Sequence, residues 1–258
     1  MVSEDGKMLK FMPVFTNRKD ISRQRCLDHY RCRHGKLAAS VPEFSRHMVK
    51  YVQNFLMEED RDKGVAGSAY VGVSECWFYS LDAFWTAFAE PRYAELREDE
   101  KRFLDLDDLL LVAASPSHIF GPTEDCAVKL FRFMALDSTA DPAAAKIYWE
   151  TGYSAAVRDD RRLRRVIRSY VQNRPMEGFV HNFPAAKGCD AADEFWFDHA
   201  DALPDFFAAE AALRQRSGHD RHFDAARTIQ FATTTKLLWD LGEDPAVGCF
   251  RVPLVGEG

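Results

Sequence analysis

The chain has 258 residues, of which 47% are hydrophobic and 29% are charged, and its formal net charge is −6. This composition is typical of a globular protein, and the negative charge argues against a nucleic-acid partner. No segment approaches the roughly 18 consecutive apolar residues of a membrane-spanning helix, and residues 1–7 contain no apolar signal core. We therefore expect a cytoplasmic protein with no membrane partner.

The residue types that commonly hold cofactors or metals show no recognisable spacing. The six cysteines are scattered without a CxxC or CxxH pair, and of His199, His219 and His222 only the last two have a helix-like separation. The sequence contains no GxGxxG, P-loop, GxSxG or HExxH motif. We therefore expect free thiols, no metal and no cofactor, and the nucleotide-binding and standard hydrolase classes lack support.

The first half of the chain predicts four strands and two helices. Alternating or apolar β-favouring runs predict the strands, at residues 8–15, 46–57, 70–79 and 109–114. The first helix begins near Ser22 and ends at Pro42, and the second begins at Ser80 and continues past Pro91 to about residue 103. The order βαββαβ is that of the ferredoxin-like fold, an antiparallel sheet covered on one face by two helices.

The second half predicts the same order of elements. The strands are expected at 127–134, 166–173, 194–197 and 228–234, and the helices at 142–157 and from 203 to about 216. Residues 115–125, which contain Pro116, Gly121 and Pro122, predict a linker between the halves. We expect two domains, at 7–120 and 126–237, followed by a C-terminal tail at 238–258.

The two halves also share sequence at a constant offset. Tyr51-Val52-Gln53-Asn54 recurs as Tyr170-Val171-Gln172-Asn173, 119 positions later. The same offset brings Glu75-Cys76-Trp77-Phe78 onto Glu194-Phe195-Trp196-Phe197 and Lys10 onto Lys129. A fixed offset over separated segments indicates two copies of one unit of about 115 residues. The bare sheet faces of two such units can bury one another, which predicts a sandwich or barrel within one chain.

The first half resembles the EthD domain. The resemblance rests on Leu27-Asp28-His29-Tyr30-Arg31-Cys32-Arg33-His34-Gly35-Lys36-Leu37-Ala38, Pro42, Arg46, the Tyr-Val-Gln-Asn segment, Glu75 to Phe78, 80–83 and 100–105. It covers nearly all of the first half, whereas the second half keeps the strands and loses the helix motif. The resemblance implies an α+β fold, with two tandem ferredoxin-like domains forming an intramolecular dimeric α+β barrel. Relatives of this fold include polyketide cyclases, decarboxylases, isomerases, cofactor-free monooxygenases and some haem enzymes, so the fold alone selects no reaction.

His34 is the first catalytic candidate, because EthD-like sequences typically carry a histidine at this position near the end of the first helix. A histidine titrates near neutral pH and suits a general acid or base. The alternative is a structural role, since a histidine cation is also favoured at a helix C-terminus. Both readings remain open from the residues alone.

Other candidates come from the strands and the first helix. His47 and Tyr51 share a face of the strand predicted at 46–57, about 13 Å apart, and are assigned with His34 as catalytic candidates. A structural role for Tyr51 is the alternative, because it is repeated as Tyr170. Glu75 could instead form an ion pair with Arg46. The substrate-binding candidates are Tyr30, Asn54, Glu75, Trp77 and His29.

We expect the second half to be a degenerate copy, because His34 corresponds to Tyr153 and a phenol is a poor base at neutral pH. It is kept to complete the barrel, or its cavity has been rebuilt. Its pocket candidates are Tyr153, Tyr170, His181 and Trp196.

These observations predict a cofactor-independent lyase or isomerase of the dehydratase, cyclase or decarboxylase type. Its substrate would be a small aromatic, polyketide-like or other apolar ring compound, processed by histidine acid/base catalysis. The alternatives are a non-catalytic ligand-binding or accessory protein, and a cofactor-free or haem-dependent monooxygenase. Either a monomer or a homodimer is compatible with a barrel completed within one chain.

Overall fold

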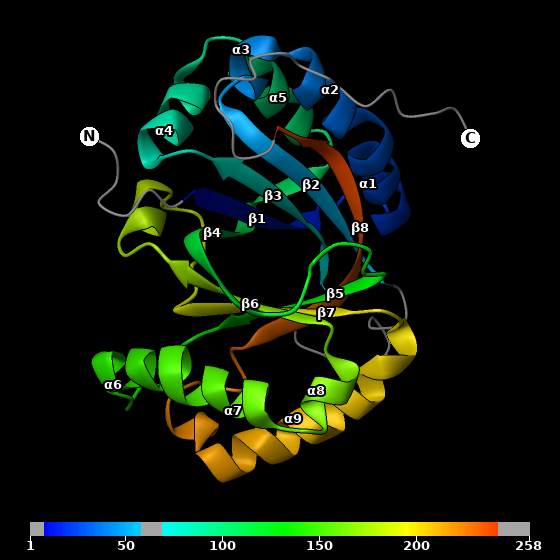
Figure 1. Ribbon diagram of the computed structural model, residues 1–258. Coiled ribbons are helices and arrows are strands. Elements are labelled where there is room, and N and C mark those ends of the chain that lie inside the picture. Colours follow the sequence, from blue (N-terminus) through cyan, green and yellow to red (C-terminus); the bar gives the residue numbers. More distant parts are fainter. Residues whose placement is uncertain (1–7, 58–68, 242–258) are drawn as a thin grey trace.

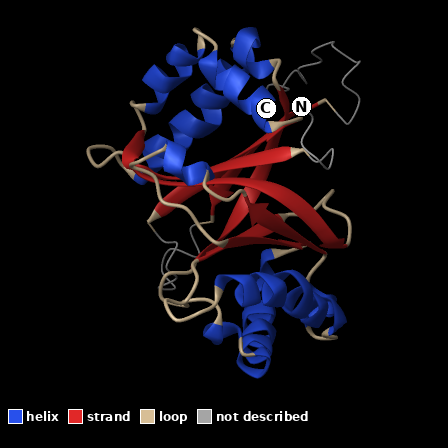
Figure 2. Cartoon of the chain, turned by 90° about the vertical axis from the view of Figure 1, so that its left-hand side faces the viewer, coloured by secondary structure: helices blue, strands red, loops and turns tan. Residues whose placement is uncertain are grey.

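The computed structural model describes residues 8–57 and 69–241. Within these ranges eight strands form one closed antiparallel barrel in the order β1-β3-β2-β8-β5-β7-β6-β4. One group of helices packs outside the barrel on one side and a second group packs on the opposite side (Figure 1). Figure 2 shows the same layers after a quarter turn, with the strands between the two helical groups. The fold is therefore α+β.

The strands divide equally between the halves of the chain. The first half contributes β1 (Leu9–Asn17), β2 (Met48–Leu56), β3 (Tyr70–Phe78) and β4 (Leu104–Phe120). The second half contributes β5 (Val128–Met134), β6 (Ser169–Pro175), β7 (Ala191–Phe197) and β8 (Ile229–Asp240). Both sets have the same internal order, which is β4-β1-β3-β2 in the first half and β8-β5-β7-β6 in the second.

The helices lie between the strands in both halves. Those of the first half are α1 (Arg23–His29), the π-helical segment η1 (Tyr30–His34), α2 (Gly35–Ser40), α3 (Pro42–Ser45), α4 (Leu81–Ala89) and α5 (Tyr93–Glu100). Those of the second half are α6 (Pro142–Ile147), the π-helical η3 (Tyr148–Tyr153), α7 (Ser154–Asp159), α8 (Leu163–Val166) and α9 (Leu203–Ser217). Short 3₁₀ segments η4 (Phe179–Asn182), η5 (Ala200–Ala202) and η6 (His219–Arg221) complete the second half. In the part of the chain described, no helix combines the length and apolar character needed to cross a membrane.

The capping residues in the sequence predict where the helices begin, but the sequence does not predict every helix end. The hydroxyl of Ser22 accepts a hydrogen bond of 3.2 Å from the N–H three residues on, and Ser80 does the same at 3.1 Å, so both predicted caps are confirmed. The prediction of one helix continuing past Pro91 is wrong, because α4 ends at Ala89 and α5 begins at Tyr93. Proline lacks an N–H and disfavours helical geometry in the residue before it.

Two further boundary predictions are wrong. The strand predicted at 46–57 begins at Met48, and His47 lies in a turn in which its N–H bonds the carbonyl of Phe44 at 3.2 Å. His47 and Tyr51 therefore do not share a strand face. The strand predicted at 166–173 begins at Ser169, because the preceding residues form α8.

Two long strands close the barrel. β4 pairs with β1 up to Ala114 and then with β6 from Ala114 to Phe120. The predicted linker at 115–125 is therefore wrong as far as Phe120. This end of β4 is paired only with β6, because its pairing with β1 ends at Ala114. Pro116, which lacks an N–H, is tolerated at such a one-sided position of a strand. β8 likewise pairs first with β5 and then with β2, and extends to Asp240; the remainder of the predicted tail, from residue 242, lies outside the described residues.

The barrel interior holds a buried cluster of four charges. Lys10 and Lys129 come from β1 and β5, and Glu75 and Glu194 from β3 and β7. Lys10 Nζ lies 2.5 Å from a Glu75 carboxylate oxygen and also bonds Glu194, while Lys129 bonds Glu75 and lies 3.9 Å from Glu194. Each side chain is at most 3% exposed. Burial raises the pKa of Glu75, but the two ammonium groups outweigh it and lower that pKa to about 2.

The cluster explains several of the residues repeated between the halves. Asn54 donates a hydrogen bond of 2.8 Å to Glu75, and Asn173 donates one of 2.9 Å to Glu194. Lys10 lies 4.9 Å from the ring centre of Trp77. The expected ion pair between Glu75 and Arg46 is wrong, because Arg46 bonds Glu90 outside the barrel. Asn54, Glu75 and Trp77 thus belong to the barrel interior and not to a wall between helices and sheet.

Candidate functional site

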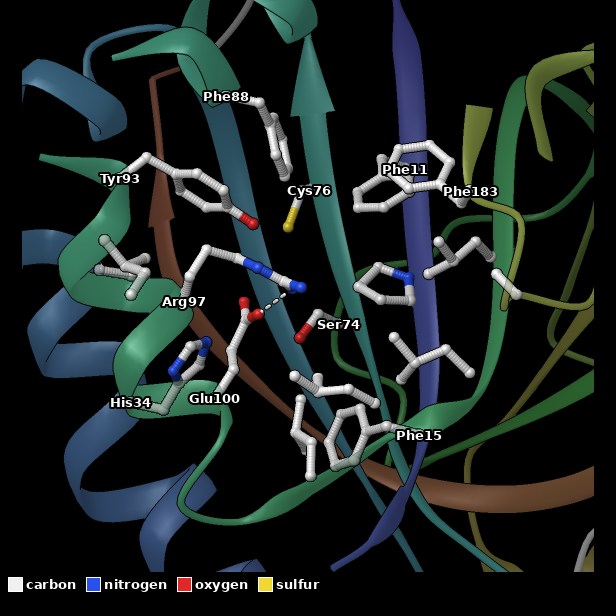
Figure 3. Close-up of a pocket in the computed structure, with 18 of the residues that line it drawn as sticks. Phe11, Phe15, His34, Ser74, Cys76, Phe88, Tyr93, Arg97, Glu100 and Phe183 are labelled. Carbon is white, nitrogen blue, oxygen red and sulfur yellow. Dashed lines mark hydrogen bonds and ion pairs between the residues drawn. The ribbon is translucent and has the colours of Figure 1, made fainter. Parts of the chain in front are cut away.

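A cavity of about 460 Å³ lies in the first half, between its helices and the outer face of its strands (Figure 3). Most of its wall is apolar, and its volume is in the range of small-molecule sites. The apolar wall includes Phe11, Phe15, Phe44, Met48, Phe88, Leu96, Phe103, Leu109, Leu111 and Phe183. The polar groups that reach it include those of Tyr30, His34, Tyr51, Ser74, Tyr93, Arg97, Glu100 and Asn182, with the thiol of Cys76. Three of the predicted residues, Tyr30, His34 and Tyr51, therefore lie together.

The π-helical segment η1 carries both Tyr30 and His34. Widening of a helix by one residue redirects its side chains and frees a backbone carbonyl, and such segments are frequent at functional sites. Here the side-chain amide of Gln53, from β2, donates a hydrogen bond of 2.7 Å to the Tyr30 carbonyl. The second half repeats the arrangement, with Gln172 donating to the Trp149 carbonyl at 2.8 Å beside η3. The repeated glutamine thus holds the helix that presents His34.

Asp99, on α5, holds the ring of His34. Its carboxylate lies 3.1 Å from Nδ1 of His34 and, through its other oxygen, 2.8 Å from Nε2 of His29. Burial raises the pKa of Asp99, but the hydrogen bonds with His34 and His29 outweigh it and lower the pKa overall. Among residues 8–57 and 69–241, Nε2 of His34 has no hydrogen-bond partner. A carboxylate that fixes one imidazole nitrogen leaves the other able to exchange a proton with a ligand.

Two phenols and a serine form the polar part of the cavity floor. The hydroxyl of Tyr30 lies 2.8 Å from the Ser74 hydroxyl, and the hydroxyl of Tyr51 lies 3.4 Å from it. Burial raises the pKa of both tyrosines far above the ordinary value, so both stay neutral near pH 7. They can orient an oxygen of a ligand by hydrogen bonding, but they cannot act as bases.

The α5 helix contributes polar residues that sequence reasoning missed. Arg97 and Glu100 form an ion pair of 2.5 Å, and Figure 3 shows the Arg97 side chain reaching across the pocket toward Ser74. The Arg97 side chain is 43% exposed, so this end of the cavity reaches solvent. Tyr93, Arg97 and Glu100 are spaced i, i+4 and i+7, which places them on one helix face. That spacing was the signal that could have identified them.

The other first-half candidates lie elsewhere. Nε2 of His47 lies 3.0 Å from Glu90, which also bonds Arg46, and His47 does not line the cavity. His29 does not line the cavity, and its ring stacks on that of Phe103 with ring centres 4.6 Å apart. The structure therefore does not bring His47 together with His34 and Tyr51.

In the second half, buried polar groups fill the corresponding space. Tyr153, at the position of His34, donates a hydrogen bond of 2.9 Å to Glu210 and accepts one of 2.9 Å from Arg132. Tyr170 donates a bond of 2.9 Å to Asp193, which occupies the position of Ser74. Tyr153 and Tyr170 are fully buried in an apolar core, so neither lines an open pocket.

The remaining second-half candidates do not form a pocket either. Trp196 faces Lys129 in the barrel interior, with the Nζ atom 3.9 Å from the ring centre. His181 is exposed and does not line the first-half cavity.

A segment of the second half instead covers the cavity of the first. Residues 176–187, here the covering segment, follow β6, and the side chain of Phe183 enters the pocket beside Phe11 (Figure 3). Its backbone is held to β4 by bonds from Met176 to Ala113 at 2.7 Å and from Lys187 to Leu109 at 2.8 Å. Residues of both halves therefore enclose the cavity.

No group of three or more histidine, cysteine, aspartate or glutamate side chains that could hold a metal ion occurs in the described residues.

Comparison with solved structures finds proteins that share the fold of this chain. An anthrone oxidase-like protein is 9% identical, with 93% of this chain and 97% of that chain covered and a TM-score of 0.56. A proposed monooxygenase from Fusobacterium nucleatum is 7% identical, with 90% and 94% covered and a TM-score of 0.54. A mutant chlorite dismutase from Candidatus Nitrospira defluvii is 11% identical, with 90% and 93% covered and a TM-score of 0.51. At these identities the likeness shows a shared fold alone.

Sequence comparison finds a similarity within the first half. No curated protein sequence matches the chain significantly. Residues 18–107 match the EthD domain, and this range contains η1, β2, β3 and α5, which together supply most of the cavity's polar groups. Over residues 18–107 the first half is therefore similar to the EthD domain.

Proposed function

We propose that the protein is an enzyme that moves a proton on a small apolar ring compound bound in the first-half cavity. The observation that carries this proposal is the setting of His34. Its Nδ1 is held by Asp99, and its Nε2 has no partner in the described chain at the wall of an apolar cavity of about 460 Å³. The aromatic wall favours a flat ring, and the few polar groups give it an orientation.

The reaction we favour begins with proton abstraction by His34. Neutral His34 takes a proton from an acidic ring carbon or hydroxyl, and the electron pair of the broken bond moves onto a ring oxygen as an enolate or phenolate. Tyr51, Ser74 or Arg97 can donate a hydrogen bond to that oxygen. The imidazolium then returns the proton at another atom, which gives an isomer, or protonates a departing hydroxyl, which releases water. Asp99 stabilises the imidazolium throughout.

A second candidate reaction shares the first step. The fold likeness to an anthrone oxidase-like protein and to a proposed monooxygenase supports oxidation of the same anion by dioxygen. A ring CH₂ group and O₂ would then give a ring carbonyl and one water. Oxygen consumption in proportion to product separates this reaction from isomerisation or dehydration.

Replacement of His34 by Gln tests the proposal. Anthrone is a suitable probe, because it is an apolar tricyclic ketone with an acidic ring CH₂ group. We expect the wild-type protein to accelerate exchange of those hydrogens with D₂O, followed by NMR, and His34→Gln to lose about 100-fold of that acceleration. His199→Gln, at an exposed position just before η5, is the matched control. Equal exchange rates for wild type and His34→Gln, at equal anthrone affinity, would refute a proton-transfer role.

Two non-lyase alternatives have distinct outcomes. Tight binding of ring compounds with no exchange, isomerisation or oxygen uptake would support a ligand-binding or accessory protein. A band near 400 nm in the visible spectrum of the purified protein, lost on denaturation, would support a haem-dependent enzyme.

We also infer that the halves are copies of one ferredoxin-like unit, at 7–120 and 126–237. The same strand order in both, the π-helical segments at equivalent positions and the paired Gln53 and Gln172 contacts support this inference. Because the eight strands close within one chain, barrel formation needs no second chain. Native mass spectrometry would distinguish a monomer from a homodimer.

A further inference from the structure

A second cleft, separate from the cavity, is lined by arginines. It has a volume of about 270 Å³ and is formed by residues after β1, on α1 and η1, and in the turn after α5. Its basic residues are Arg18, Arg25, Arg33 and Arg102, with His29, and its apolar residues are Ile21 and Phe103. This concentration of positive charge stands out in a chain whose formal net charge is −6.

Most of these arginines make no direct ion pair in the described chain, although Asp20 also interacts electrostatically with Arg25. Arg18 is paired, because its guanidinium bonds the carboxylate of Asp20 and the carbonyl of Lys101. Within residues 8–57 and 69–241, the guanidinium groups of Arg25, Arg33 and Arg102 make no hydrogen bond or salt bridge. Three like charges around one cleft repel each other unless an anion neutralises them.

We propose that this basic cleft binds the phosphate group of a small organic phosphate. Guanidinium groups bind phosphate oxygens with paired, charge-assisted hydrogen bonds, which makes arginine well suited to such recognition. Ile21 and Phe103 provide an apolar surface for the organic part of the ligand. The cleft is small and lies on a negatively charged protein, so it favours a compact anion over a nucleic acid.

The cleft and the cavity share a wall. Phe103 lines both, and the ring of His29 stacks on Phe103 at 4.6 Å. His29 also bonds Asp99, which holds His34. The phosphate therefore belongs either to a separate ligand or to an anionic group carried by the compound in the cavity; the second case rests on the proposed function.

Isothermal titration with pyrophosphate tests the site. We expect a dissociation constant below about 1 mM for the wild-type protein, and at least about tenfold weaker binding for the double variant Arg33→Gln/Arg102→Gln. The matched control is Arg161→Gln/Arg165→Gln, which removes two exposed arginines of the second half. The proposal is overturned if pyrophosphate binds no better than chloride at equal ionic strength, or equally well to the double variant and the control.

Two additional ligands identify the source of the phosphate. If one compound occupies both sites, 1-naphthyl phosphate binds at least tenfold more tightly than either 1-naphthol or pyrophosphate, and the double variant loses that gain. If the ligands are separate, 1-naphthol and pyrophosphate bind independently. His34→Gln should leave pyrophosphate binding unchanged, so failure of the proposed acid/base role would not remove the anion site.

Discussion

The carboxyl group of Asp193 should make the stability of the protein fall as pH rises toward neutrality. Asp193 is fully buried, and its Oδ1 accepts hydrogen bonds of 2.9 Å from both Trp149 and Tyr170. Its Oδ2 has no partner among the described residues. Burial raises the pKa of Asp193 from 3.8 to about 7, against the opposing charge of Arg132.

The sign and size of the effect follow from proton linkage. Between pH 4 and pH 7 the folded protein keeps this proton while the unfolded chain loses it, so the stabilisation present at low pH is lost as pH rises through about 7. From about pH 5 to about pH 8 the loss is roughly 2.5 kcal/mol, since one pKa unit corresponds to about 1.4 kcal/mol. His219 acts in the opposite direction, because burial lowers its pKa to about 2.

Comparison with Asp193→Asn isolates the contribution of Asp193 from that of His219. The variant keeps the size of the side chain and cannot titrate, so it should not show the loss of stability that Asp193 causes in the wild type. From pH 5 to pH 8 the unfolding free energy of the variant should therefore rise by roughly 2.5 kcal/mol relative to that of the wild type. Urea unfolding at several pH values, followed by fluorescence, measures this difference. A difference that stays constant over that range would refute the buried, protonated carboxyl.

Two other variants test the barrel cluster and the covering segment. Glu75→Gln leaves Lys10 and Lys129 with one buried carboxylate between them, and we expect the free energy of unfolding in urea to fall by about 3–5 kcal/mol. Glu98→Gln, at an exposed position, is the control and should change that free energy by no more than about 0.5 kcal/mol. Equal losses for the two variants would contradict a stabilising role of the cluster. Phe183→Ala opens one wall of the cavity, so we expect the affinity of the variant for 1-naphthol, measured by titration, to fall about tenfold. Its midpoint of thermal denaturation should change little. Unchanged affinity would show that the covering segment does not contact the ligand.

Much of the local structure could be predicted because its determinants lie close together in sequence. Ser22 and Ser80 cap helices by bonding N–H groups three residues away. Tyr30 and His34 belong to one short helical motif, and both line the cavity with Tyr51. The repeat offset paired positions that prove to make matching contacts in both halves.

The features that could not be predicted from the sequence depend on contacts between segments that are far apart in the chain. Glu75 was assigned to an arginine partner, whereas its partners Lys10 and Lys129 reach it only when both halves close the barrel. Asp99 holds His34 from 65 residues away, and no local pattern marks that pairing. The covering segment reaches the first-half cavity because β6 pairs with the distal end of β4.

The long strands β4 and β8 make the sheet of each half depend on the other half. Without the second half, β2 would lose its neighbour β8 and the end of β4 would lose β6; without the first half, β6 and the end of β8 would lose theirs. Exposed strand edges template association with other chains. Each half therefore covers strand edges that the other half would otherwise expose, so the pairing of β2 with β8 and of β4 with β6 links the stability of the two halves.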